Sequence, residues 1–253
     1  MRFIFAHFNH ISPKEIGQHH IIAYLNFIKT EHGVGRDKCR MVAQSCSFFF
    51  KHILPTPYLV PHEFYPRKEF KLPDILSVEQ ITHVLNVTTN LKHKAILALL
   101  YGTGIRLGEL RFLQMKSIDR QQLQIKIIAA KGNKDRFTIL PQLLIPVLEQ
   151  YYRAYKPATF LFEGQSKGVP MNDRSIQHAI RKSMIDAGLG EFKFSAHSLR
   201  HTFATHLLDN GNDIHTIKEL LGHSKIETTM IYLHLTKQKR EQLVSPLDVV
   251  WNG

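Results

Sequence analysis

The chain has 253 residues, of which 43% are hydrophobic, so it can bury a sizeable core in one large domain or two smaller ones. Lysine and arginine total 33 against 21 acidic residues, and the formal charge of +12 favours a polyanionic partner, nucleic acid before an anionic membrane surface. No apolar run approaches the roughly 20 residues that span a bilayer, and the first residues lack a secretory cleavage pattern, which indicates a soluble, cytoplasmic protein with no membrane partner.

The first part of the chain has the pattern of a small helical domain. Ser12–Glu15 is a capping box with proline at the first helical position, and it predicts the start of a helix whose apolar residues recur to Ile28. A second helix is predicted over Asp37–Leu54. The only two cysteines, Cys39 and Cys46, lie two turns apart on one face of it, which indicates buried reduced thiols.

Two cations of that second helix, Lys38 and Arg40, are candidates for DNA-phosphate contacts, beside the ordinary interpretation as solvated charges. Prolines then punctuate the stretch Pro55–Pro73, which is too proline-rich for a helix. We interpret it as a linker. The sequence therefore predicts two domains, a helical one with its linker over residues 1–72 and a second one over residues 73–253.

The second domain is predicted to be mainly helical. The capping box Ser77–Gln80 opens it, and helices are expected around 81–85, 92–101 and 107–115. Between Ile118 and Leu140 the apolar residues alternate, which predicts short strands and a β-hairpin with a basic tip at Lys131–Asp135. Helices return downstream. The expected fold class is mainly α with a small β-sheet, in two domains.

The residues that could carry chemistry are weak signals when they are taken singly. Arg106 precedes Glu109 by three residues, which is ordinarily a surface ion pair. Lys131 in a hairpin turn is ordinarily a solvated cation. His197 and Arg200 share one helical face, and such a pair is usually structural.

Their order along the chain changes this interpretation. Further on, a helix is predicted to end at Gly222, and His223 follows directly. Tyr232 comes after a distance that allows a tight turn and a new helix. A set of two arginines, a lysine, two histidines and a late tyrosine is suited to metal-free phosphodiester cleavage. Two always-ionised guanidinium groups can hold the non-bridging oxygens as negative charge builds up on them. No cofactor is expected.

A metal site is not expected either. His197 and His201 have the i, i+4 spacing of a helical zinc pair, but Ser198 stands where a zinc protease needs its glutamate. His201, His206 and His234 are interpreted as packing or surface residues.

Four segments together resemble the signature boxes of the tyrosine recombinase, or phage integrase, family, and they occur in the family's order. The segments are Gly104–Leu110, Lys131–Arg136, His197–Thr205 and Leu221–His223, the last followed by Tyr232. The resemblance extends from about Leu76 to about Leu235.

This resemblance implies a catalytic set and a nucleophile. The catalytic set is Arg106, Lys131, His197, Arg200 and His223, and the nucleophile is Tyr232, which would form a 3′-phosphotyrosyl link and free a 5′-hydroxyl. Lys131 would protonate the leaving oxygen, His197 would assist proton transfer at Tyr232, and His223 would bond the phosphate. Glu109 would have an orienting role rather than a chemical one. Lys134 and Arg136 would contact the DNA backbone.

The resemblance also implies the partners. We expect double-stranded DNA with paired recombination sites, and a tetramer formed on it by exchange of the C-terminal tail Leu235–Gly253, whose apolar residues have little else to bury. The first domain resembles a partial form of the family's SAM-like core-binding domain, because only Met1–Ile11 precede the first predicted helix. Two alternatives are a type IB topoisomerase and a DNA-binding protein without catalysis.

Overall fold

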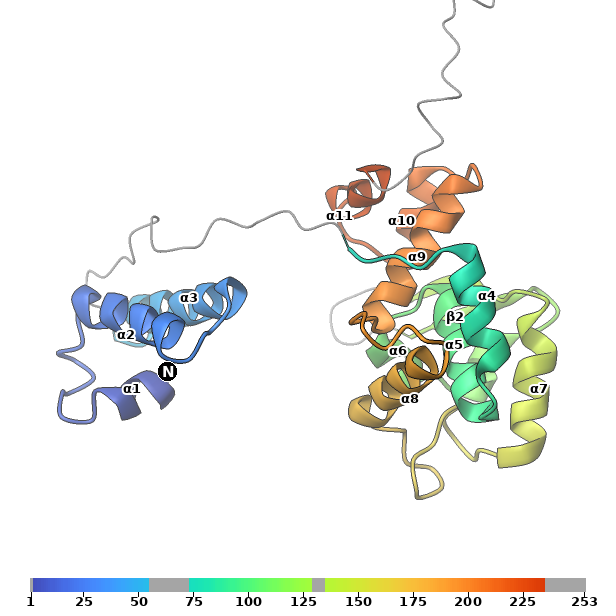
Figure 1. Cartoon of the computed structure of the whole chain (residues 1–253), viewed down its shortest axis with the longest axis horizontal. Coiled ribbons are helices and arrows are strands. Elements are labelled where there is room, and N and C mark those ends of the chain that lie inside the picture. Colours follow the sequence, from blue (N-terminus) through green and yellow to red (C-terminus); the bar gives the residue numbers. More distant parts are fainter. Residues whose placement is uncertain (1, 55–72, 129–134, 235–253) are drawn as a thin grey trace, which may run out of the picture. The chain divides into compact units, whose positions relative to one another are not determined.

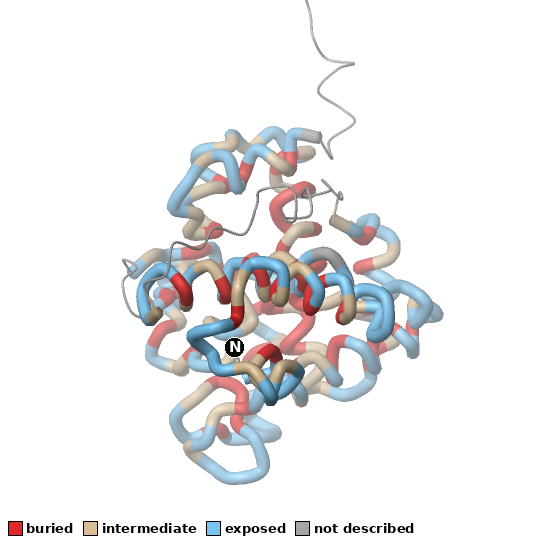
Figure 2. Tube along the Cα trace, turned by 90° about the vertical axis from the view of Figure 1, so that its left-hand side faces the viewer, coloured by how far each residue is buried: buried red, intermediate tan, exposed pale blue. Residues whose placement is uncertain are grey.

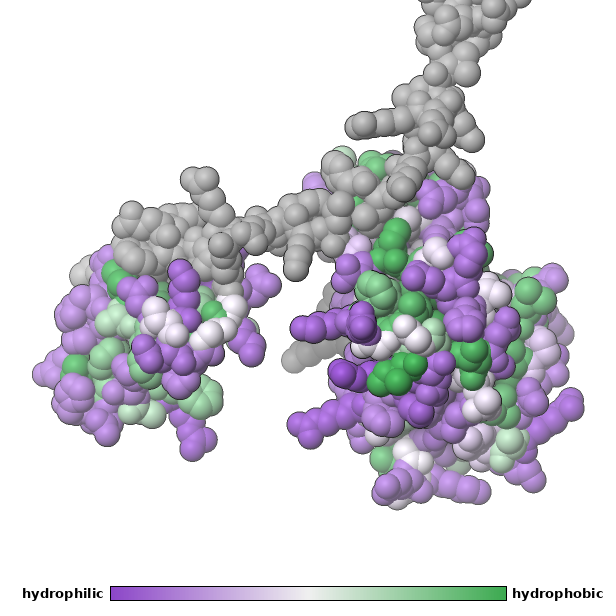
Figure 3. Space-filling view, viewed as in Figure 1, coloured by the Kyte–Doolittle hydropathy of each residue, from purple (hydrophilic) through white to green (hydrophobic). Residues whose placement is uncertain are grey.

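The structure is a computed structural model that describes residues 2–54, 73–128 and 135–234 (Figure 1). The chain divides into a first unit, Met1–Lys71, and a second unit, Leu72–Gly253. Buried positions alternate with exposed ones along the helices of both units (Figure 2). On the face that Figure 3 shows, hydrophilic side chains cover most of the described surface, with smaller apolar areas between them.

The described residues of the first unit form three helices, namely α1 (Arg2–His7), α2 (Gln18–Thr30) and α3 (Arg36–His52). Their inward faces make one core, in which Ile21, Ala43 and Phe50 are almost fully buried. Cys39 and Cys46 are buried free thiols in that core, as the sequence predicts.

Two expectations for the first unit were wrong. Helix α1 was not predicted, because the sequence there has neither a capping residue nor a helical repeat of apolar residues. Only half of the predicted capping box forms: the Ser12 amide donates to a carboxylate oxygen of Glu15 at 3.3 Å, while the Glu15 amide donates to the Ser12 carbonyl at 2.8 Å and closes a local turn. Helix α2 starts later, at Gln18, because Gly17 has extended backbone angles and serves as its N-cap.

The described helices of the second unit surround one central helix. They are α4 (Val78–Val87), α5 (Leu91–Thr103), α6 (Leu107–Arg111), α7 (Leu144–Tyr155), α8 (Asp173–Asp186), α9 (Ala196–Asp209), α10 (Ile214–Leu221) and α11 (Glu227–Met230), with short 3₁₀ turns η2 (Met115–Ser117) and η3 (Ile231–His234). Helix α5 contacts α7, α8 and α9 (Figure 1). From Ala95 to Leu100 it is apolar on all sides, as expected for a helix in the middle of a core.

Two helix boundaries of this unit follow directly from their flanking residues. The Ser77 hydroxyl accepts from the Gln80 amide and caps α4, which confirms the predicted start. Helix α6 is shorter than expected. After Arg111 the chain leaves the helix, and the carbonyl of Leu113 accepts from the amide of Leu161 at 2.7 Å, so a pairing distant in sequence replaces the next helical turn.

A three-stranded antiparallel sheet completes the second unit, with the order β1 (Ile118–Asp119), β2 (Gln124–Ile127), β3 (Arg136–Ile139). Ile125 lies opposite Thr138, and Ile127 lies opposite Arg136. The polar residues Arg136 and Thr138 therefore face inward with the isoleucines of β2, while Phe137 is 54% exposed. The fold class, mainly α with a small sheet, is as predicted.

Candidate active site

Arg106 lies at the junction of α5 and α6, where it is the N-cap residue of α6. Its Nη1 donates to Glu109 Oε1 at 2.9 Å, and its backbone amide donates to Oε2 of the same carboxylate at 2.7 Å. Its Nη2 donates to the carbonyl of Gly222 at 2.9 Å. The side chain stays 36% exposed. The guanidinium is thus held in place on one side and open to solvent on the other.

Arg200 is held by the ends of two helices. Helices α5 and α10 both stop at glycines with left-handed backbone angles, Gly104 and Gly222, so their last carbonyls have no partner within the helix. Arg200 Nη1 donates to Gly104 O at 2.6 Å, and Nη2 donates to Leu221 O at 2.7 Å. Burial, together with repulsion from Arg106, lowers the pKa of Arg200 to about 10. The group therefore remains charged at neutral pH.

His223 follows directly on the glycine that ends α10. Its Nδ1 is 2.9 Å from the hydroxyl of Thr229, and its ring stacks at 6.4 Å, centroid to centroid, on the ring of Tyr232. Burial first, then the charges of Arg200 and Arg106, lower the pKa of His223 to about 4. The imidazole is therefore neutral at pH 7, and it stacks on the tyrosine ring near both arginines.

Tyr232 lies in η3 and is only 1% exposed. Its ring belongs to a small core made with residues of α9 and α10, among them Phe203 and Leu221. Burial raises the pKa of the phenol to about 12, although the charges of Arg200 and Arg106 oppose that rise. In this arrangement the tyrosine is a neutral phenol shielded from solvent.

The sequence analysis gave no role to His201, yet this histidine contacts the phenol. His201 Nδ1 is 3.0 Å from Tyr232 Oη. Burial, His197 and Arg200 lower the pKa of His201 to about 4, so it is neutral at pH 7. The signal was present in the sequence: the i, i+4 spacing from His197 places both histidines on one face of α9. His197 itself is exposed.

Glu109 connects two arginines from different elements. Arg136 of β3 donates from Nη1 and Nη2 to the two carboxylate oxygens at 2.7 and 2.8 Å, and Arg106 binds the same carboxylate. Burial raises the pKa of Glu109, but the hydrogen bonds from Arg136 and Arg106 outweigh it and bring the pKa to about 2. Arg136 is inward-facing and only 14% exposed. A DNA-backbone contact for Arg136 stays a prediction that these partners do not support.

Four further predicted site residues are not among the contacts described above. Lys131 and Lys134 are outside the described residues. Lys38 is exposed and Arg40 half-buried on α3 of the first unit. Within the described residues no group of three or more histidine, cysteine, aspartate or glutamate side chains could hold a metal ion.

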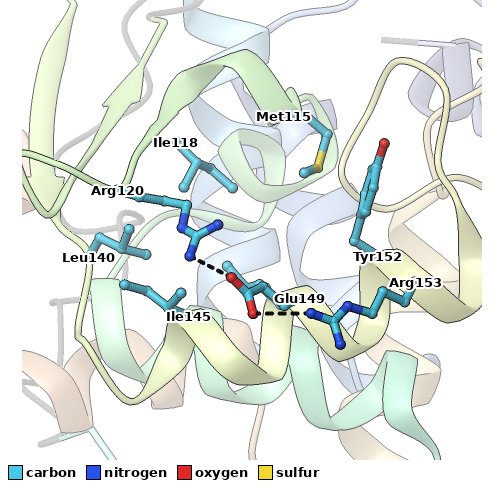
Figure 4. Close-up of a pocket in the computed structure, with 9 residues that line it drawn as sticks. Met115, Ile118, Arg120, Leu140, Ile145, Glu149, Tyr152 and Arg153 are labelled. Carbon is cyan, nitrogen blue, oxygen red and sulfur yellow. Dashed lines mark ion pairs between the residues drawn. The ribbon is translucent and has the colours of Figure 1, made fainter.

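A pocket between η2, β1 and α7 is not part of this constellation. Figure 4 shows Arg120 and Arg153 on either side of Glu149 at its rim, and none of the candidate catalytic residues lines it.

Comparisons with known proteins agree with this geometry. The model of the phage integrase family matches residues 75–239. Tyrosine recombinase XerC of Natranaerobius thermophilus is 35% identical over 195 residues, which cover 70% of this chain and 64% of that protein. The crystal structure of XerA recombinase has a TM-score of 0.63 at 28% identity and covers 96% of this chain and 91% of that one.

A further similar structure is that of XerH site-specific recombinase bound to palindromic difH substrate. It has a TM-score of 0.75 at 23% identity and covers 91% of this chain and 72% of that one. This likeness is one of fold. The chain belongs to the phage integrase family and is a tyrosine-type site-specific DNA recombinase. None of its described helices is long and apolar enough to cross a membrane.

Proposed function

We propose that the chain cuts and rejoins double-stranded DNA at paired recombination sites through a 3′-phosphotyrosyl link to Tyr232. One observation carries the proposal. Arg106 and Arg200 converge on the end of α10, directly beside His223 and Tyr232, although they come from distant parts of the chain. Support for a DNA partner comes from XerH, whose structure is a complex with its difH substrate.

The two arginines are suited to bind the scissile phosphate. A phosphodiester under attack carries extra negative charge on its non-bridging oxygens, and preorganised cations stabilise that charge without reorganisation. The donors of Arg106 and Arg200 that point to backbone carbonyls fix the orientation of each guanidinium. His223, neutral and adjacent to both, supplies a further hydrogen bond to the phosphate.

The nucleophile is the Tyr232 oxygen, which attacks phosphorus and displaces the 5′-oxygen of the next nucleotide. Since the phenol is buried here, attack requires that η3 present it to the DNA. His201 is the base in contact with the phenol in this arrangement, and His197, one turn earlier and exposed, is the base predicted from the family resemblance. Lys131 protonates the leaving oxygen. The phosphotyrosyl bond conserves the energy of the broken ester, so rejoining needs neither ATP nor metal.

The test is covalent trapping on a DNA duplex with a nick near the cleavage point, which releases the short product and prevents rejoining. We expect the wild type to form a protein–DNA adduct in excess EDTA, and Tyr232→Phe to form none while binding DNA normally, because it loses no cation. Tyr101→Phe is the matched control, since Tyr101 is a partly buried tyrosine of the same unit and its hydroxyl is also 3.0 Å from a histidine nitrogen, that of His206. An adduct with Tyr232→Phe, or loss on chelation that magnesium restores, contradicts the proposal.

We propose that strand exchange takes place in a tetramer joined by the tail Leu235–Gly253, which lies outside the described residues. The resemblance to the family and the apolar content of the tail support this assembly.

A further inference from the structure

Three consecutive carbonyls at the end of α10 each accept a hydrogen bond from a different arginine. Leu220 O accepts from Arg136 Nε at 3.0 Å. The next two, Leu221 O and Gly222 O, accept at 2.7 and 2.9 Å from the two candidate catalytic arginines described above. Carbonyls at a helix C-terminus lack intrahelical donors and carry partial negative charge, so they attract cations. The end of α10 is thus a common support for three guanidinium groups.

Arg136 differs from the other two arginines in where its remaining donors point. Its Nη1 and Nη2 both bind Glu109, at 2.7 and 2.8 Å, so its three donor nitrogens all have protein acceptors. Among the described residues, Arg106 and Arg200 each have acceptors for Nη1 and Nη2 alone. Exposure does not separate the three, because Arg136 is 14% exposed, Arg106 36% and Arg200 5%. It also packs on the backbone of Gly222, where an added Cβ would lie 2.7 Å from its Cδ. This geometry leaves Arg136 poorly placed to contact a DNA phosphate.

We infer that Arg136 is a positioning residue that acts on the DNA-cutting reaction through Glu109 and Arg106, rather than by contact with DNA. Glu109 binds Arg106 through both the guanidinium and the backbone amide, so whatever fixes the carboxylate fixes Arg106. The inference rests on the proposed function, in which Arg106 binds the scissile phosphate.

Charge balance gives a second reason for this role. The carboxylate of Glu109 is 15% exposed and would neutralise Arg106 if the two formed an isolated pair. With Arg136 present, two positive groups share one negative group, and a net charge of +1 remains for the phosphate. The pKa of Glu109, lowered to about 2 despite burial, shows how strongly the carboxylate is held in its charged form. Removal of Arg136 would leave Arg106 bound to Glu109 with no net charge.

The experiment compares cleavage of two nicked duplexes, one with a normal scissile phosphodiester and one with a neutral methylphosphonate there. The methylphosphonate lacks one charged oxygen, so its cleavage depends less on a positive clamp. Displacing a catalytic group by about 1 Å can cost roughly a hundredfold in rate. We therefore expect Arg136→Ala to lose about that factor on the phosphodiester and much less on the methylphosphonate. Arg136→Lys keeps the charge but not the two parallel bonds to Glu109. Its cleavage rate on the phosphodiester should therefore lie between the rates of the wild type and Arg136→Ala.

Arg120→Ala is the matched control, because Arg120 also pairs with a glutamate, Glu149 at 2.5 Å, but on the exposed rim of the pocket. We expect it to cleave both substrates at the wild-type rate. An equal loss for Arg136→Ala on both substrates would show a purely structural role and overturn the inference. So would an unchanged single-turnover rate with a salt slope of binding reduced by about 0.9, the sign of one lost phosphate contact.

A second measurement separates this inference from the proposed function. If the wild type forms no covalent adduct, the proposed function fails. The link between Arg136 and Glu109 is then tested by the unfolding midpoints of Arg136→Ala, Glu109→Gln and the double variant without DNA. Shifts that do not add support the coupling, since each change removes the same pair of bonds. Additive shifts contradict it.

Discussion

Gly104→Ala perturbs the point at which α5 ends and Arg200 is held. Gly104 has a positive φ of +62°, and a Cβ added there would lie 2.2 Å from the ring of Phe203 and 3.0 Å from the side chain of Leu221. Atoms never approach that closely, so the buried ring of Phe203 has to move. The Gly104 carbonyl also accepts from Arg200 at 2.6 Å, so a shift of this backbone also displaces the guanidinium that is proposed to bind the scissile phosphate.

The cost can be estimated in two parts. A residue with a Cβ in the left-handed region costs about 1–2 kcal/mol, and forcing extra volume into a packed core costs about 1–3 kcal/mol more. We therefore expect Gly104→Ala to lower the free energy of unfolding by about 2–5 kcal/mol, the sum of the two ranges.

Gly188→Ala is the control for the cost of the left-handed backbone alone. Gly188 lies in the same unit with a φ of +73°, and an added Cβ would meet nothing within 4 Å. It should cost only about 1–2 kcal/mol, the backbone contribution. Urea unfolding followed by circular dichroism measures both. If Gly104→Ala costs no more than Gly188→Ala, then the contact of Phe203 with Gly104 is not as described here.

Three further predictions follow from the site. Burial lowers the pKa of His201 and of His223 to about 4, below the value of about 6.5 in an unfolded chain. The unfolded state then binds more protons between these values, so the melting temperature should fall as pH decreases from about 6.5 to about 4, and an unchanged melting temperature would refute this. Lys131→Ala should be nearly inactive on normal DNA yet cleave a substrate with a 5′-bridging sulfur, a leaving group that needs little protonation; rescue of Lys134→Ala instead would reverse the assignment. Deleting the chain after Arg240 should impair recombination more than single-site binding in a mobility-shift assay, and equal losses would show that the tail only completes its own unit.

Local signals in the sequence predicted much of the second unit. The capping box at Ser77 and the glycine that ends α10 act over a few residues, so the sequence is enough to place them. Ser12 shows the limit of this reasoning. Its amide binds the Glu15 carboxylate as the capping box predicts, but whether a turn continues into a helix depends on the residues that follow, and here the helix begins only after Gly17.

The inward position of Arg136 could not be read from periodicity. In β3 the apolar residues Phe137 and Ile139 are exposed, while Arg136 and Thr138 face inward, the reverse of the usual pattern. The reason is tertiary: Thr138 donates to the carbonyl of Thr103 at 2.8 Å, and Arg136 reaches Glu109 and Leu220, all far away in sequence. The same holds for Tyr232. Its place after Gly222 and His223 marks it as the candidate nucleophile, but its burial depends on how α9 and α10 pack around it.

The measurement that tests the central claim most directly is to map the covalent bond in a trapped protein–DNA adduct. Proteolysis and mass spectrometry of the adduct, with DNA labelled separately on each side of the cleavage point, identify both the modified residue and the DNA end it holds. The account predicts a single nucleotide-bearing peptide that contains Tyr232, attached through a 3′-phosphate, and a free 5′-hydroxyl on the released strand. Attachment to another residue, or to a 5′-phosphate, would contradict it.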